Sequence, residues 1–141
     1  MRRRFVVAFA AAGLAASVSG CGGPITPGEL SRSIETLEST AAEGAMLAGD
    51  VADDRTKATF ARAHARDMSD VVVHEAEKLN DAEADQSDVA AAKTKAIDLA
   101  DKIDTTLGQI QVAPDDEPGA RQAETELDDL SKQAGNVASG L

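Results

Sequence analysis

The stretch TPGELSRSIETLESTAAEGAMLAGDVA, residues 26–52, decides the fold class of this chain. Thr26 supplies an N-cap hydroxyl, Pro27 stands at the first helical position, and Glu29 completes a capping box. Small and apolar residues then recur every three or four positions, within roughly 40° of one helical face. They are Leu30, Ile34, Leu37, Ala41, Gly44, Ala48 and Ala52, with Met46 on the opposite face. The stretch therefore predicts an amphipathic helix.

Three further segments show the same spacing. The second helix is expected to run from an N-cap at Asp53 or Asp54 to about Leu79, with Asn80 as C-cap. The third is expected from an N-cap at Ser87 or Asp88 to Ile110. The fourth is expected over about residues 118–138. Their expected core positions are Ala61, Ala65, Met68, Val72, Ala76 and Leu79, then Val89, Ala92, Ala96, Leu99, Ile103, Leu107 and Ile110, and finally Ala120, Ala123, Leu127, Leu130, Ala134 and Val137. The loop before the fourth helix contains Pro114 and Pro118-Gly119.

Four amphipathic helices joined by short polar loops predict an all-α fold. An up-down-up-down four-helix bundle of Ala-rich helices, formed by residues 26–141 as a single domain, is the simplest way to bury every apolar face. Large apolar residues are few, since Leu, Ile, Val and Phe occupy 22 of the 121 positions from Cys21 onward. The last segment has the fewest of them. The alternative is a long helical hairpin with a loosely docked last helix.

Residues 1–20 have the pattern of an export signal. Met1 to Arg4 are basic, and the apolar run from Phe5 to Val18 follows. Fourteen helical residues cover about 21 Å, short of the roughly 30 Å hydrocarbon core of a bilayer. The run is therefore interpreted as the hydrophobic region of a signal peptide.

The tetrapeptide Val18-Ser19-Gly20-Cys21 resembles the lipobox of bacterial lipoproteins. The resemblance covers residues 1–21 only, and the rest of the chain is not assigned to any family. It implies that a signal peptidase recognises Val18, Ser19 and Gly20, that Cys21 becomes the lipidated N-terminus, and that residues 21–25 form a short tether. It also implies export and attachment to the outer face of the cytoplasmic membrane.

Two other interpretations of Cys21 stay open: a chance cysteine after an ordinary secretory signal, or a buried structural cysteine. It is the only cysteine in the chain, so no intramolecular disulfide can form. The export route is also open, because the run Arg2-Arg3-Arg4-Phe5 fits both a general secretion signal and a degenerate twin-arginine signal.

Charge and aromatic content exclude several classes of partner. From Cys21 onward the chain has 11 Lys and Arg against 25 Asp and Glu, a net charge of −14. Nucleic acids and anionic lipid headgroups require basic surfaces, so neither is an expected ligand. Phe60 is the only aromatic residue after the leader, which disfavours sites that stack sugars or nucleobases.

No combination of residues predicts a catalytic, cofactor or metal site. The densest group on the second helix comprises His64, Asp67, Met68, Asp70, His74 and Glu75. His64 and Met68 have the i, i+4 spacing that could hold Cu(I), but His64 and His74 lie about 15 Å apart along a helix axis. We therefore expect Met68 in the core and His64 at its boundary. The acidic groups Asp50/Asp53/Asp54, Asp81/Glu83/Asp85/Asp88 and Asp115/Asp116/Glu117 lack a calcium-loop pattern and are expected to be solvated caps and loops.

These observations predict a lipid-anchored cell-envelope protein whose helical domain is not an enzyme and has no cofactor. Its expected role is structural or protein-binding, through an unknown protein partner or self-association, with the lipid on Cys21 contacting the membrane. The alternative is an envelope lipoprotein that handles copper or a divalent ion. A cradle for an apolar ligand between the helices would require an open, sizeable apolar cavity.

Overall fold

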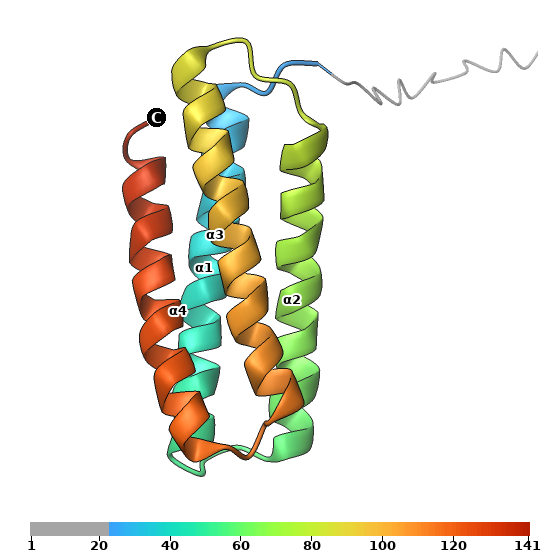
Figure 1. Cartoon of the computed structure of the whole chain (residues 1–141), viewed down its shortest axis with the longest axis vertical. Coiled ribbons are helices and arrows are strands. Elements are labelled where there is room, and N and C mark those ends of the chain that lie inside the picture. The colour runs from blue at the N-terminus through green and yellow to red at the C-terminus, as the bar shows by residue number, and fades with distance from the viewer. Residues whose placement is uncertain (1–22) are drawn as a thin grey trace, which may run out of the picture.

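The computed structural model describes residues 23–141, which form four helices running alternately down and up (Figure 1). The helices are α1 (Pro27–Ala52), α2 (Ala58–Asp81), α3 (Ser87–Val112) and α4 (Glu117–Ala138). Loops of four or five residues join them, so consecutive helices are antiparallel. The predicted four-helix bundle is confirmed. Within the described part of the chain, no helix combines the length and the apolarity needed to cross a membrane.

The four helices do not contact one another equally. The most extensive interfaces are α1 with α4 and α2 with α3, and α1 also touches α3 across the bundle. No contact joins α2 to α4. The last helix is thus packed along α1, and the alternative hairpin with a loosely docked α4 is not the arrangement found.

Helix α1 begins with the predicted capping box. The Thr26 hydroxyl accepts a hydrogen bond from the Glu29 backbone N–H at 3.3 Å, and the Glu29 carboxylate accepts one from the Thr26 N–H at 2.9 Å. The buried face of α1 is wider than the predicted stripe, because α1 contacts all three other helices. It also includes Ala45, Leu47, Gly49 and Val51. Met46 is 74% exposed on the opposite face, as expected.

The helix starts differ from the sequence prediction. Asp53 closes α1 instead of capping α2, and Asp54 in the loop has a positive φ of 53°. Helix α2 begins after Lys57 and α3 after Gln86, both without a side-chain cap. Asp53 is not placed to cap α2, because α2 begins five residues later, and its carboxylate is paired with Arg55 and Arg121. At its other end α2 passes the expected C-cap Asn80 and stops at Asp81.

The predicted stripes of α2, α3 and α4 form the core. All their positions are buried except Ala76, Ala92 and Val137, which are half-buried against it. Small residues let α1 and α4 approach closely. At Gly44 an added Cβ would lie 2.9 Å from a Leu107 methyl and 3.1 Å from a Leu127 methyl, so the glycine leaves room for both leucines.

Polar side chains in the core have hydrogen-bond partners. The Thr40 and Thr106 hydroxyls donate to carbonyl oxygens one turn earlier, at 2.8 and 3.0 Å. The Ser33 hydroxyl accepts from the Lys78 ammonium at 3.0 Å. Because burial of an unpaired polar group is costly, these bonds make the few buried polar positions compatible with the core.

Candidate functional site

The first described residues are attached to one end of the bundle. The Ile25 N–H donates to the Glu83 carbonyl oxygen at 2.7 Å, Pro24 forms an isolated bridge with Glu83, and Ile25 packs against the core. Pro24 and Ile25, which we expected in the tether, therefore contact the α2–α3 loop. Cys21 and its proposed recognition residues Val18, Ser19 and Gly20 lie outside the described residues.

The two ends of the bundle differ. The end that carries Ile25, the α2–α3 loop and the C-terminus is here called the near end, and the end that carries the α1–α2 and α3–α4 loops is the far end (Figure 1). Helix α1 has 26 residues and joins the two ends. At 1.5 Å per residue it places them about 39 Å apart.

The histidine and methionine of the possible copper pair have separate environments. Met68 is buried in the core, whereas His64 Nε2 lies 2.8 Å from Glu43 Oε1 on α1 and the His64 ring stacks on Phe60 with centroids 5.4 Å apart. The predicted core and boundary positions are confirmed. Among residues 23–141, no three His, Cys, Asp or Glu side chains are grouped in a way that could hold a metal ion.

One acidic group joins two helices. Asp53, the C-cap of α1, accepts from Arg121 of α4 at 2.8 Å, and Arg121 also donates to the Ala52 carbonyl oxygen at 3.3 Å. The Arg121 hydrogen bond lowers the pKa of Asp53, and Arg55 adds a favourable charge. Asp53 therefore has a structural role beyond that of a solvated cap.

Two large apolar side chains are exposed at the far end. Phe60, in the first turn of α2, is 58% exposed, and Val112, the last residue of α3, is 83% exposed. These segments are neighbours, because Arg62 Nε donates to the Gln111 carbonyl oxygen at 3.0 Å. Exposed apolar groups of this size can contribute to a protein contact.

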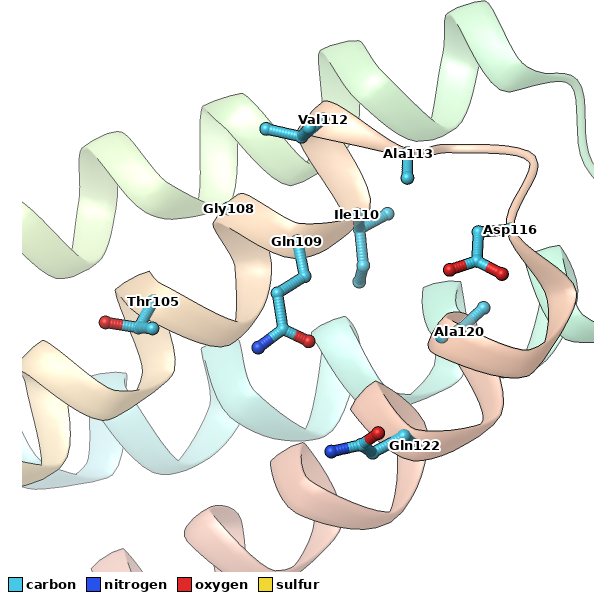
Figure 2. A pocket seen from close by; sticks show the side chains of 10 residues that line it. Thr105, Gly108, Gln109, Ile110, Val112, Ala113, Asp116, Ala120 and Gln122 are labelled. Carbon is cyan, nitrogen blue, oxygen red and sulfur yellow. The ribbon is translucent and has the colours of Figure 1, made fainter.

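A cavity of about 650 Å³ lies at the far end between the last turns of α3 and the first turns of α4. Ile110, Ala113 and Ala120 point into it, with Asp116 at one side and Gln109 at the other, whereas Val112 points away (Figure 2). The full lining is Thr105, Gly108, Gln109, Ile110, Val112, Ala113, Asp116, Gly119, Ala120 and Gln122.

The spacing of apolar residues in the sequence does not reveal this cavity. Its lining comes from two helices and from a loop that the sequence marked only as acidic and rich in proline. The available signal was Gly108, a glycine inside an amphipathic helix at a position where an added Cβ would meet nothing within 4 Å. A glycine there costs helix stability without serving close packing, which indicates open space beside it.

The fold and these features define a protein of the four-helix-bundle class, with one attached end and one end that carries a cavity and exposed apolar groups. No protein-family model, curated protein or solved structure matches the chain.

Proposed function

We propose that this protein is a lipid-anchored component of a bacterial cell envelope, held on the outer face of the cytoplasmic membrane through Cys21. Its four-helix domain binds another protein, or copies of itself, and catalyses no reaction. The basic and apolar leader and the Val18-Ser19-Gly20-Cys21 motif support the anchor. The exposed apolar residues Phe60 and Val112 support the binding role.

One observation carries the geometry of this proposal: the Ile25–Glu83 hydrogen bond attaches the chain to the near end four residues after Cys21. Only Gly22 and Gly23 separate Cys21 from the first paired residue, Pro24. At about 3.5 Å per residue, this segment holds the near end close to an acylated Cys21. The far end would then face away from the bilayer at a distance of about 40 Å, the length of α1.

Membrane attachment is tested with Cys21→Ala, which removes the acyl acceptor. We expect the wild-type protein to stay with membranes after a carbonate wash and Cys21→Ala to be released. Two acyl chains anchor a protein stably, whereas a signal peptide directs export without providing a lasting anchor. Mass spectrometry of the wild-type protein should find acyl groups on an N-terminal Cys21. Equal sedimentation of both forms, or an unmodified thiol at Cys21, contradicts the anchor.

Binding through the far end is tested by gentle extraction with the anchor intact, followed by crosslinking. Phe60→Ser combined with Val112→Ser should reduce the crosslinked species, because it removes exposed apolar area without opening the core. Met46→Ser is the control, since Met46 is 74% exposed, a value between those of Phe60 and Val112, but lies on a different helix, α1. If Met46→Ser reduces crosslinking as much as the double variant, the contact is not made through Phe60 and Val112.

The structure offers no support for metal handling. Met68 is buried and His64 is paired with Glu43, so the two candidate ligands serve the core and an interhelical contact. We therefore propose the protein-binding role alone.

A further inference from the structure

The α3–α4 cavity differs from the exposed apolar residues beside it because it is concave and largely lined by uncharged groups. Its volume of about 650 Å³ is in the range of sites that hold small molecules, about 300–1,000 Å³. Gly108 and Gly119 have no side chain that would fill it, and Ala113 exposes aliphatic surface in it, whereas Ile110 and Ala120 are buried beneath it at 2% and 4% exposure. No aromatic side chain lines it, so the surface suits an aliphatic body better than a planar ring.

Asp116 is the only charged residue in the lining. Among residues 23–141 its carboxylate forms no ion pair. Arg55 and Arg121, at the same end of the bundle, are paired with other carboxylates. The neighbouring Arg121 is bound to Asp53, Glu124 and the Ala52 carbonyl oxygen. Asp116 is the only charge in the lining and no basic side chain is present, so the side chains of the cavity favour a cation over an anion.

Gly119 determines where the Asp116 carboxylate lies. A Cβ at Gly119 would stand 2.3 Å from Asp116 Oδ2, so the carboxylate occupies space that any other residue would fill. In this position it faces the same space as Ile110 and Ala120 (Figure 2). The neutral side chains Gln109, Thr105 and Gln122 supply hydrogen-bonding groups elsewhere in the lining.

We propose that this cavity binds a small amphipathic cation, with its ammonium group against Asp116 and its aliphatic body over Gly108 and Ala113, above the buried Ile110 and Ala120. The proposal does not rest on the lipid anchor or on the protein-binding role. Release of the wild-type protein from membranes would overturn the proposed function and leave this inference unchanged.

The test is isothermal titration of the purified full chain with three six-carbon probes: hexylammonium, hexanol and hexanoate. Hexylammonium should bind best and hexanoate worst, because Asp116 attracts the first and repels the last. Asp116→Asn should weaken hexylammonium binding about threefold or more, the scale of an exposed ion pair, and leave hexanol unchanged. Equal affinity for hexylammonium and hexanol, or no saturable binding of any probe, would overturn the proposal.

Two glycines provide a matched steric test. Gly108→Leu should place a side chain in the cavity and abolish binding, because nothing lies within 4 Å of the Cβ position. Gly28 is equally open but lies at the near end, so Gly28→Leu should leave binding unchanged. Thermal melts establish that both variants fold, and the exposed substitution Asp116→Asn decides the proposal if Gly108→Leu does not. Unchanged hexylammonium binding in a folded Gly108→Leu would place the ligand elsewhere.

Both a free alkylamine and a lysine side chain carry this ammonium chemistry. Titration with Nα-acetyl-lysine methylamide separates the two sources. Stronger binding of hexylammonium assigns the site to a free amine, and stronger binding of the lysine derivative assigns it to a polypeptide. Methyl NMR shifts of Ile110, Ala113 and Ala120 should locate either probe in the cavity, and shifts confined to other methyl groups would exclude the site.

Discussion

At the scale of single residues, two carboxylates stabilise the ends of α1. Glu29 accepts hydrogen bonds from the Thr26 backbone and hydroxyl, and these bonds lower the pKa of Glu29. Asp53 at the other end accepts from Arg121, which lowers the pKa of Asp53. The capping box could be predicted because its residues are three positions apart. The Asp53–Arg121 contact could not, because it spans 68 positions and depends on α4 lying beside α1.

These two groups predict how stability changes with acid. A carboxylate whose pKa is lower in the folded state binds fewer protons there than in the unfolded chain. Its contribution is complete above the ordinary carboxyl pKa of about 4 and is lost as the pH falls through the lower folded pKa. We therefore expect the urea concentration at the unfolding midpoint to decrease as the pH is lowered below about 4. This decrease with pH should be less steep in Asp53→Asn and in Glu29→Gln.

A double-mutant cycle checks the cause at Asp53. If Arg121 stabilises the folded state through this carboxylate, Asp53→Asn should have a smaller effect in an Arg121→Met background than in the wild type. Additive effects of the two substitutions would show that the ion pair does not carry the pH dependence.

At the scale of helices, glycines in similar sequence settings have opposite roles. Gly44 and Gly108 both interrupt an amphipathic helix, and only Gly44 belongs to a predicted buried face. The structure confirms close contact of Gly44 with Leu107 and Leu127, and it shows open space at Gly108. The three-to-four-residue spacing of apolar residues predicted the buried faces, because each helix presents one side to the core. The helix starts were less predictable, because α2, α3 and α4 begin without a side-chain cap, so no capping residue marks their first turn.

Gly→Ala at these two positions should change stability in opposite directions. Gly108→Ala should raise the free energy of unfolding by up to about 1 kcal/mol, since alanine is the better helix former and its methyl meets nothing. Gly44→Ala should lower it by about 1 kcal/mol, because overpacking two fully buried leucines outweighs the same helix gain. Urea denaturation measures both. Stabilisation by Gly44→Ala would mean that Leu107 and Leu127 adjust freely.

At the scale of the whole molecule, α4 contributes to the hydrophobic core. Its few large apolar residues suggested weak docking. The interface between α4 and α1 is nevertheless one of the two most extensive in the bundle. Leu127 is fully buried and contacts the Gly44 position. Small residues do not weaken this interface, because they let the two backbones approach and bring the remaining leucines into contact.

Leu127→Ala should therefore destabilise the whole bundle. We expect a loss of about 2–5 kcal/mol, the usual range for a buried leucine, in a single cooperative transition. Met46→Ala, at a 74% exposed position, is the matched control and should be close to neutral. Hydrogen-exchange measurements should show similar protection of the central backbone amides of α1 and α4. Fast exchange in α4 with a protected α1 would show that α4 detaches on its own.

The sequence alone determined the four helices, their buried faces and the capping box of α1, because these depend on residues a few positions apart. It also supplied the leader and Cys21 motif on which the proposed anchor rests. Only the tertiary structure decided that α4 packs on α1, that Arg121 pairs with Asp53 at the C-terminus of α1, and that a cavity lies between α3 and α4. Each of these features joins segments distant in the chain, and their contacts depend on side-chain volumes and helix pairing that local spacing does not specify.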